Sequence, residues 1–146
     1  MTQRVLILCT GNSARSQMAE GLLRKRAGAQ FDVFSAGLKP SFVNPLAIAV
    51  MRERDIDISG HRSKHLDEFI TQPFDYVITV CDTAAESCPI FRGRAQRIHW
   101  SFSDPAAFEG SDQEKRDRFR MIRDLIDSRI AEWLDTLRIA AAPGTP

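Results

Sequence analysis

The chain has 146 residues, of which 43% are hydrophobic and 27% are charged, so it is long enough for one domain with its own core. Twenty basic and nineteen acidic residues leave a formal net charge of +1, which argues against a dedicated nucleic-acid-binding protein. Because the sequence shows neither an apolar run near the roughly 20 residues of a membrane span nor a signal-peptide pattern, we expect a cytoplasmic monomer without membrane contact.

Short apolar segments alternate with amphipathic segments along the chain. The predicted strands are residues 4–8, 31–37, 74–80 and 96–100, and the predicted helices are residues 15–27, 44–54, 63–70 and 111–138. The apolar stripe of the last helix runs from Phe119 to Leu137 and includes Leu125. We expect a single domain over residues 1–139 and a flexible tail over residues 140–146. This alternation predicts an α/β fold with a four-stranded parallel sheet flanked by helices on both faces.

Three residues with useful chemistry follow closely on predicted strands. Cys9, Cys81 and Asp104 come just past the first, third and fourth strands. Because ligands of parallel α/β sheets bind at the carboxyl ends of the strands, these side chains can surround one site. The alternatives are that Cys81 is a packing residue, that Cys88 is an incidental loop thiol and that Asp104 is an ordinary turn residue.

The loop over residues 9–14 has the composition of an anion-binding loop. Its small residues let successive backbone N–H groups turn inward, and the helix that begins at Arg15 adds partial positive charge. The Arg15 guanidinium suits a tetrahedral oxyanion, Ser16 can donate to the Cys9 sulfur, and the thiolate form of Cys9 is favoured. The predicted substrate-binding residues are Thr10, Gly11, Asn12, Ser13, Ala14, Arg15 and Ser16.

The stretch CTGNSARS at residues 9–16 resembles the phosphate loop of the low-molecular-weight tyrosine phosphatases. With QMAEG after it, SAG at 35–37, VCDTAAESCP at 80–89 and HWSFSDPA at 99–106, the chain is more similar to an offshoot of that family, the thioredoxin-coupled arsenate reductases. The resemblance implies a four-stranded parallel sheet in which the first two strands cross. It also implies arsenate as substrate, phosphate or sulfate as competing anions, and no tightly bound cofactor.

Cys81 and Cys88 separate the two branches of this resemblance, because arsenate reduction needs thiols that supply two electrons and phosphate ester hydrolysis does not. The resemblance implies that Cys9 attacks arsenate while Asp104 protonates the departing hydroxyl. Cys81 then attacks Cys9, Cys88 attacks Cys81, and thioredoxin reduces the resulting disulfide. Seven helical steps would separate the Cα atoms of Cys81 and Cys88 by roughly 10 Å, too far for a disulfide. We therefore expect residues 81–90 to change conformation on oxidation.

Other functions stay open on the sequence alone. They are a low-molecular-weight phosphatase with incidental cysteines, a reductase coupled to glutaredoxin or another small thiol, and a module that binds an oxyanion without turnover. The phosphatases usually carry aromatic residues after their Asp-Pro pair, whereas this chain has Ala106 and Ala107, which disfavours a phosphotyrosine substrate. No cysteine or histidine spacing fits a zinc site, so no metal is expected.

Some reductases of this family bind potassium near the loop, at positions that resemble Asn12, Glu20 and Ser35. A further aspartate of the family corresponds to Lys64, whose ammonium group can stand where the ion would lie. We therefore expect activity to be insensitive to potassium, and we expect Asn12 to brace the loop. The alternatives are that Lys64 is a solvated surface charge and that Asn12 is an ordinary turn residue.

Overall fold

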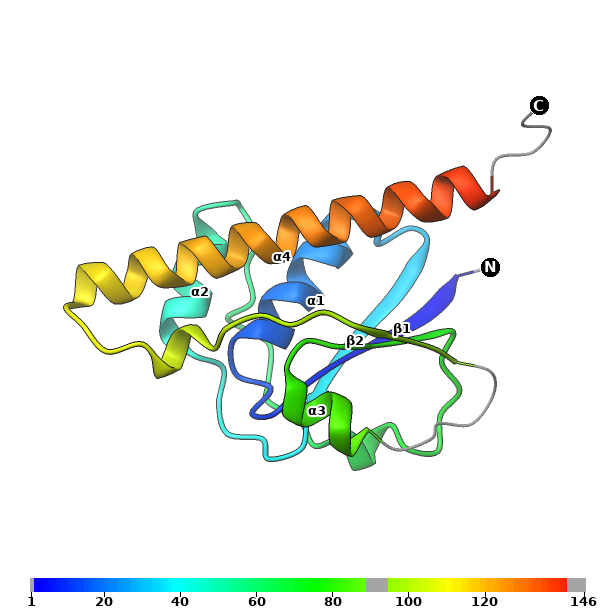
Figure 1. Cartoon of the computed structure of the whole chain (residues 1–146), viewed down its shortest axis with the longest axis horizontal. Coiled ribbons are helices and arrows are strands. Elements are labelled where there is room, and N and C mark those ends of the chain that lie inside the picture. Colours follow the sequence, from blue (N-terminus) through cyan, green and yellow to red (C-terminus); the bar gives the residue numbers. More distant parts are fainter. Residues whose placement is uncertain (1, 89–94, 142–146) are drawn as a thin grey trace.

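The computed structural model describes residues 2–88 and 95–141, which form a four-stranded parallel sheet. Its strands are β1 (Gln3–Cys9), β2 (Phe31–Gly37), β3 (Tyr76–Thr79) and β4 (Gln96–His99). They lie in the order β2-β1-β3-β4, so the first two strands exchange places relative to the chain (Figure 1). The predicted α/β class and the crossing of the first two strands are confirmed.

Helices lie on both sides of this sheet. They are α1 (Arg15–Ala27), α2 (Pro45–Arg52), α3 (Asp82–Ser87) and α4 (Asp112–Ala141), with short 3-10 turns at Leu66–Glu68 and Pro105–Ala107. Figure 1 shows α1, α2 and α4 packed together on one side of the strands and α3 on the other. Asn44 caps the N-terminus of α2, because its side chain accepts a hydrogen bond from Leu46 N at 2.9 Å.

The core lies between the sheet and the layer formed by α1 and α4. β1 is the inner strand that pairs with both β2 and β3, and its residues Val5 to Leu8 are completely buried. An unbroken apolar run suits a strand with covered faces on both sides. Across from it, Met18 and Leu23 of α1 and Ile126 and Ile130 of α4 are also completely buried, so the two helices are fixed against the strand that carries Cys9.

The apolar stripe of α4 is narrower than predicted. Phe119, Ile122, Ile126 and Ile130 are buried, but the predicted member Leu125 is 51% exposed. At about 100° per residue, Leu125 lies roughly 100° around the helix from the centre of the stripe, which places its side chain beyond the contact with α1. The prediction for Leu125 was therefore wrong.

Element boundaries differ from the predictions by a few residues, and one predicted helix is much shorter. Of the segment 63–70, only the 3-10 turn Leu66–Glu68 is helical, because the peptide groups of Lys64 instead bond to Gly37 N (2.8 Å) and Asn12 Oδ1 (2.9 Å). The helix α4 continues to Ala141, past the predicted domain end at residue 139. The rest of the predicted tail, residues 142–146, lies outside the described residues.

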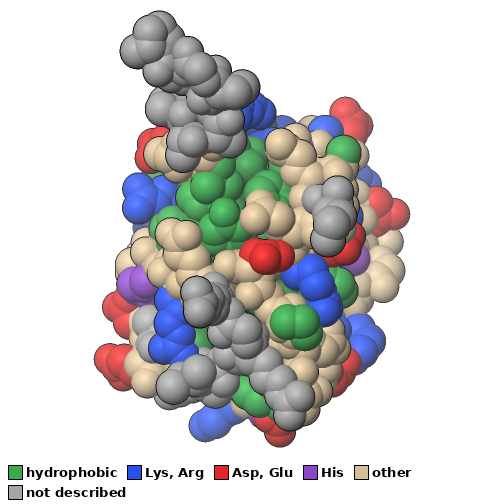
Figure 2. Space-filling view, turned by 90° about the vertical axis from the view of Figure 1, so that its right-hand side faces the viewer, with side chains coloured by type: hydrophobic (Ala, Val, Ile, Leu, Met, Phe, Trp, Pro, Cys, Tyr) green, Lys and Arg blue, Asp and Glu red, His purple; other side chains and the backbone are tan. Residues whose placement is uncertain are grey.

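Figure 2 shows an apolar area on the face that carries the C-terminal half of α4. An open groove there is lined by apolar side chains from β4, the following segment and α4, among them Ile98, Trp100, Trp133 and Leu137. Trp133 stacks on Phe31 with ring centroids 5.5 Å apart, so this area continues into the core. Within residues 2–88 and 95–141, no helix has both the length and the apolar character needed to cross a bilayer.

Candidate active site

The loop between β1 and α1 is bound on its outer side by two other segments. Its carbonyl groups accept hydrogen bonds there: Thr10 O from Lys39 N (2.8 Å), Gly11 O from Ser63 Oγ (2.7 Å), and Ser13 O from Asn44 N (3.0 Å). In a trans peptide the N–H points opposite to the preceding C=O. The next amide groups therefore face inward, toward Cys9, and form a cradle for an anion.

The Cys9 sulfur lies at the base of this cradle, and the residue as a whole is only 2% exposed. It accepts a hydrogen bond from Asn12 N at 3.2 Å, and Ser16 Oγ lies 2.8 Å from it. Both groups are therefore placed to donate to this sulfur when it acts as the nucleophile. The predicted contact between Ser16 and Cys9 is present.

The N-terminus of α1 adds to the positive character of the cradle. Ala14 is the N-cap residue and supplies no side-chain cap, and the first turn of α1 contains no acidic residue. The first N–H groups of a helix need an acceptor, and the helix dipole favours an anion there. The sequence thus leaves this helix end open to a bound oxyanion.

Asn12 holds the loop from behind. It is completely buried, and its backbone has φ = 47°, a left-handed conformation that asparagine tolerates. Its side chain makes four hydrogen bonds: to Ser16 Oγ (2.8 Å), Ser35 Oγ (2.9 Å), Gln17 Nε2 (3.0 Å) and Lys64 N (2.9 Å). Each hydrogen-bonding position of the amide is used, so Asn12 fixes the distance between the loop, α1 and the segment at Lys64.

Arg15 and Asp104 lie next to each other at a cavity of about 280 Å³ that is also lined by Cys9, Ser13 and Ser41. Arg15 Nη1 donates to the Phe102 carbonyl at 3.0 Å, and Arg15 Nη2 lies 3.8 Å from Asp104 Oδ2. The Arg15 side chain is 13% exposed and the Asp104 side chain 42%. The guanidinium is thus held at the cavity wall, and the carboxyl group is open to the cavity.

Cys81 lies beside the same loop. Its sulfur is 3.3 Å from Thr10 Oγ1, the hydroxyl of the residue that follows Cys9, and the residue is 5% exposed. Cys88 lies at the other end of α3, in a separate small pocket that also contains Thr79 and His99. Burial raises the pKa of the Cys88 thiol, and Arg97 partly opposes that shift. All three cysteines are reduced.

A second polar cluster lies behind the loop, around Glu20. This carboxylate is 4% exposed and accepts from Ser35 Oγ at 2.7 Å. Three cationic or titratable groups approach it: Arg24 Nη1 (3.1 Å), His61 Nδ1 (3.3 Å) and Lys64 Nζ (4.0 Å). Burial lowers the pKa of Lys64 and of His61, and Glu20 opposes both shifts. Lys64 is only 13% exposed, so the interpretation of a solvated surface charge is wrong.

Several residues of the site were not predicted from the sequence. Gln17 is completely buried and donates to Asn12 and to the Arg62 carbonyl, and Ser63 and Ser41 lie against the loop. Gln17 could have been found from the sequence, because it is a polar residue directly after Arg15 and Ser16 at the start of the helix. No local signal existed for Ser63, because its partner Gly11 is 52 residues away along the chain.

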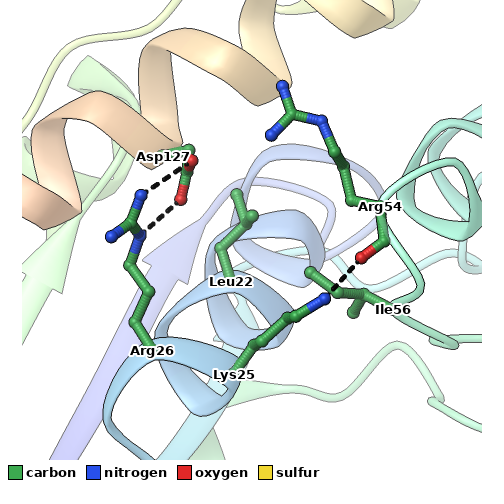
Figure 3. Close-up of a pocket in the computed structure, with 6 residues that line it drawn as sticks. All are labelled: Leu22, Lys25, Arg26, Arg54, Ile56 and Asp127. Carbon is green, nitrogen blue, oxygen red and sulfur yellow. Dashed lines mark hydrogen bonds and ion pairs between the residues drawn. The ribbon is translucent and has the colours of Figure 1, made fainter.

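Figure 3 shows a different cavity, of about 200 Å³, between the C-terminal half of α1 and α4. Its polar side chains already have partners: Arg26 forms two hydrogen bonds to Asp127, at 2.7 and 3.0 Å, and Lys25 Nζ donates to Arg54 O at 2.6 Å. No cysteine is among the residues that line this cavity, and it lies at the opposite end of α1 from Arg15. We therefore take the loop cavity as the candidate active site.

Comparisons with known proteins agree with this geometry. The family model described as low molecular weight phosphotyrosine protein phosphatase matches residues 4–142. An arsenate reductase of Halalkalibacterium halodurans is 46% identical over 137 residues, which are 93% of this chain and 99% of that protein.

Solved structures give the same result. An arsenate reductase in the phosphate binding state has a TM-score of 0.73 at 31% identity, covering 92% of this chain and 98% of the other. A thioredoxin-dependent arsenate reductase of Corynebacterium glutamicum has a TM-score of 0.74 at 32% identity, covering 95% of this chain and 63% of that one. The chain belongs to the low molecular weight phosphotyrosine protein phosphatase family and, within it, to the arsenate reductases.

Proposed function

We propose that this protein reduces arsenate to arsenite with the thiols of Cys9, Cys81 and Cys88, and that thioredoxin regenerates them. The observation that carries the proposal is the 3.3 Å contact between Thr10 Oγ1 and Cys81 Sγ. It brings a second thiol to the loop that holds the nucleophile. Hydrolysis of a phosphate ester has no use for such a thiol, whereas a two-electron reduction needs it.

The first step uses the cradle. Arsenate binds to the inward N–H groups of the loop and to Arg15, and the Cys9 thiolate forms a bond to arsenic. A hydroxyl group leaves as water with a proton from Asp104, which is open to the cavity. The binding residues in this proposal are Thr10, Gly11, Asn12, Ser13, Ala14, Arg15 and Ser16.

The second step transfers the electrons. The Cys81 thiolate attacks the Cys9 sulfur, the sulfur–arsenic bond breaks, and its electron pair stays on arsenic. Arsenic is thereby reduced from the pentavalent to the trivalent state, and the two thiols are oxidised to a Cys9–Cys81 disulfide. Cys88 then attacks Cys81, which releases Cys9 as a thiolate and leaves a Cys81–Cys88 disulfide.

Thioredoxin is the proposed reductant for that last disulfide. The support is the solved neighbour from Corynebacterium glutamicum, which is a thioredoxin-dependent arsenate reductase. Reduction by a glutaredoxin or a small thiol is the alternative, and phosphate and sulfate are expected to compete with arsenate. The monomeric state and the cytoplasmic location stay predictions.

Potassium has no part in the proposed mechanism, because the residues around Glu20 do not fit the ion. Both Asn12 Oδ1 and Ser35 Oγ already bond to protein donors. The Glu20 carboxylate accepts from Ser35 and is approached by the cations of Arg24 and Lys64. A further cation there would meet two positive charges, and the side-chain oxygens of Asn12, Glu20 and Ser35 are already engaged in these contacts.

The test is arsenate-dependent oxidation of NADPH in the presence of thioredoxin and thioredoxin reductase. The wild type and the variants Cys9→Ser, Cys81→Ser and Cys88→Ser are compared, and all three variants are expected to lose steady turnover. Full activity of Cys88→Ser would overturn the relay. A parallel assay with glutaredoxin and glutathione distinguishes the reductants, and hydrolysis of p-nitrophenyl phosphate by Cys81→Ser reports whether the loop itself is intact.

A further inference from the structure

The helix α3 cannot stay helical while a disulfide joins the two cysteines at its ends. Cys81 is the N-cap of α3 and Cys88 its C-cap, and seven residue steps at 1.5 Å put their Cα atoms roughly 10 Å apart. A disulfide needs Cα atoms about 4.4–6.8 Å apart. Whatever stabilises α3 therefore opposes closure of the Cys81–Cys88 bond.

The stability of α3 comes from outside the helix. It has only six residues, and isolated helices of that length do not persist in water. The N-cap residue Cys81 makes no side-chain cap hydrogen bond. The contacts that hold α3 in place are therefore tertiary, and two of them converge on its first residue, Asp82.

Asp82 is bound by two side chains that belong to or follow the edge strand β4. His99 Nε2 donates to Asp82 Oδ1 at 2.9 Å, and Ser101 Oγ donates to the same oxygen at 3.2 Å. A carboxylate in the first turn is also favoured by the helix dipole. In the sheet, β4 is separated by β3 from β1 and its loop, and neither donor lines the loop cavity, so they hold the helix without taking part in the anion cradle.

His99 is itself anchored in the sheet. Its other ring nitrogen, Nδ1, lies 2.8 Å from Thr79 Oγ1, and Thr79 is 5% exposed at the end of β3. Thr79 and His99 are direct partners in the register of β3 and β4. The imidazole thus bridges a fixed point of the sheet to the N-terminus of a helix that has little stability of its own.

We propose that His99, anchored by Thr79, is a latch that holds α3 helical through Asp82 in the reduced protein, and that it must release Asp82 before the Cys81–Cys88 disulfide can close. This inference rests on the proposed thiol relay and assigns His99 as a positioning residue for it. In the closing step Cys88 attacks Cys81, the Cys81–Cys88 bond forms, and the Cys9–Cys81 bond breaks with its electron pair on Cys9. His99 exchanges no atom or electron in that step.

The latch is testable without arsenate or thioredoxin. In a Cys9→Ser background the chain keeps only Cys81 and Cys88, so their equilibrium with reduced and oxidised dithiothreitol reports one disulfide. Removing the latch weakens the reduced, helical state alone. The variant His99→Ala is therefore expected to raise the disulfide equilibrium constant about two- to fivefold, the range for one exposed polar contact. Amide exchange within α3 of the reduced protein is expected to speed up by a similar factor.

His65→Ala is the matched control. His65 pairs with Asp67 at 3.4 Å with exposed fractions of 42% and 75%, and the His99–Asp82 pair has 38% and 74%. This control variant is expected to leave the equilibrium unchanged. The conservative variant His99→Gln, which keeps a donor, is expected to restore part of the wild-type value.

Equal disulfide equilibrium constants for His99→Ala and His65→Ala would overturn the proposed role of His99 but would not contradict the thiol relay. A failure of every variant, including the parent, to form the Cys81–Cys88 disulfide would overturn the relay and the latch together. Circular dichroism of each reduced variant shows whether it is folded. If His99→Ala does not fold, the comparison is made with His99→Gln instead.

Discussion

Replacing Asn12 with alanine tests whether the anion loop is held by its buried hydrogen bonds. The Asn12 side chain makes four of them, and their partners are Ser16, Ser35, Gln17 and the backbone of Lys64. Alanine removes all four bonds, and Ser16, Ser35 and Gln17 keep only their other bonds, to Cys9, Glu20 and the Arg62 carbonyl. It also places a residue less tolerant of left-handed backbone at φ = 47°.

The size of the effect follows from these contacts. At about 1 kcal/mol for each hydrogen bond, the four bonds contribute about 4 kcal/mol, and the backbone conformation adds up to ~1 kcal/mol. A domain of this size unfolds with about 5–15 kcal/mol, so Asn12→Ala is expected to fold but with Tm lowered by roughly 15 °C. Asn12→Gly is expected to recover ~1 kcal/mol, because glycine accepts the left-handed conformation.

Urea unfolding at pH 7 measures this loss, and the other asparagine of the chain gives the control. Asn44 makes one side-chain hydrogen bond, to Leu46 N, as the cap of α2. Asn44→Ala is therefore expected to cost about 1 kcal/mol. Because Asn12 N also donates to the Cys9 sulfur, kcat/KM of Asn12→Ala for arsenate is expected to fall about 100-fold.

An equal free energy of unfolding for Asn12→Ala and Asn44→Ala would refute this reasoning. The buried bonds around Asn12 would then contribute no more than one part-buried helix cap. A large loss of stability with unchanged kcat/KM would refute the second part, because the loop would then keep its shape without Asn12.

Three further predictions concern single contacts. Thr10→Val removes the hydroxyl beside the Cys81 sulfur, so we expect kcat to fall about tenfold while the Kd for arsenate stays unchanged. Single-turnover kinetics and binding measurements test this prediction, and an unchanged kcat would contradict it. Replacing sodium with potassium is expected to leave kcat/KM within about twofold, and a several-fold rise would show that Lys64 does not substitute for the ion. Arg120 and Arg123 hold the pKa of Glu53 at about 2, below its ordinary 4.5, so its stabilising charge is complete above about pH 5 and is lost as the pH falls toward 2. Glu53→Gln is therefore expected to be less stable than wild type at pH 7 by about 1 kcal/mol and equally stable near pH 2; equal urea midpoints at pH 7 would argue against it.

The general position of the site could be predicted because it depends on chain order alone. Cys9 is the last residue of the inner strand β1 and opens the loop that ends at Arg15, and a parallel sheet brings the carboxyl ends of its strands to one edge. Cys81 follows β3, the neighbour of β1, so its approach to the loop follows from the same rule. The helices α1 and α4 were predictable from the spacing of their apolar residues.

We expected Asn12 to brace the loop, but its support from residues 63 and 64 could not be predicted, because those contacts join residues that are far apart in the chain. Ser63 bonds to Gly11, and the peptide of Lys64 bonds to both Asn12 and Gly37. Those bonds hold residues 63–65 out of helical geometry, so the local pattern of residues 63–70 misled the prediction. Charged side chains are usually exposed, so the sequence alone did not indicate that Lys64 is buried beside Glu20.

The two parts of the site differ in how their supports are buried, and the proposed chemistry needs that difference. The anion loop depends on Asn12, which is completely buried, so its hydrogen bonds are costly to break and the cradle keeps one shape. The helix α3 is tied to β4 by His99 and Asp82, which are 38% and 74% exposed and therefore separate at little cost. A nucleophile that binds a tetrahedral anion needs fixed donors, whereas a thiol relay needs its second and third sulfurs to approach each other. Burial thus holds the first part in one shape, whereas the second part is tied to β4 by an exposed contact that can open.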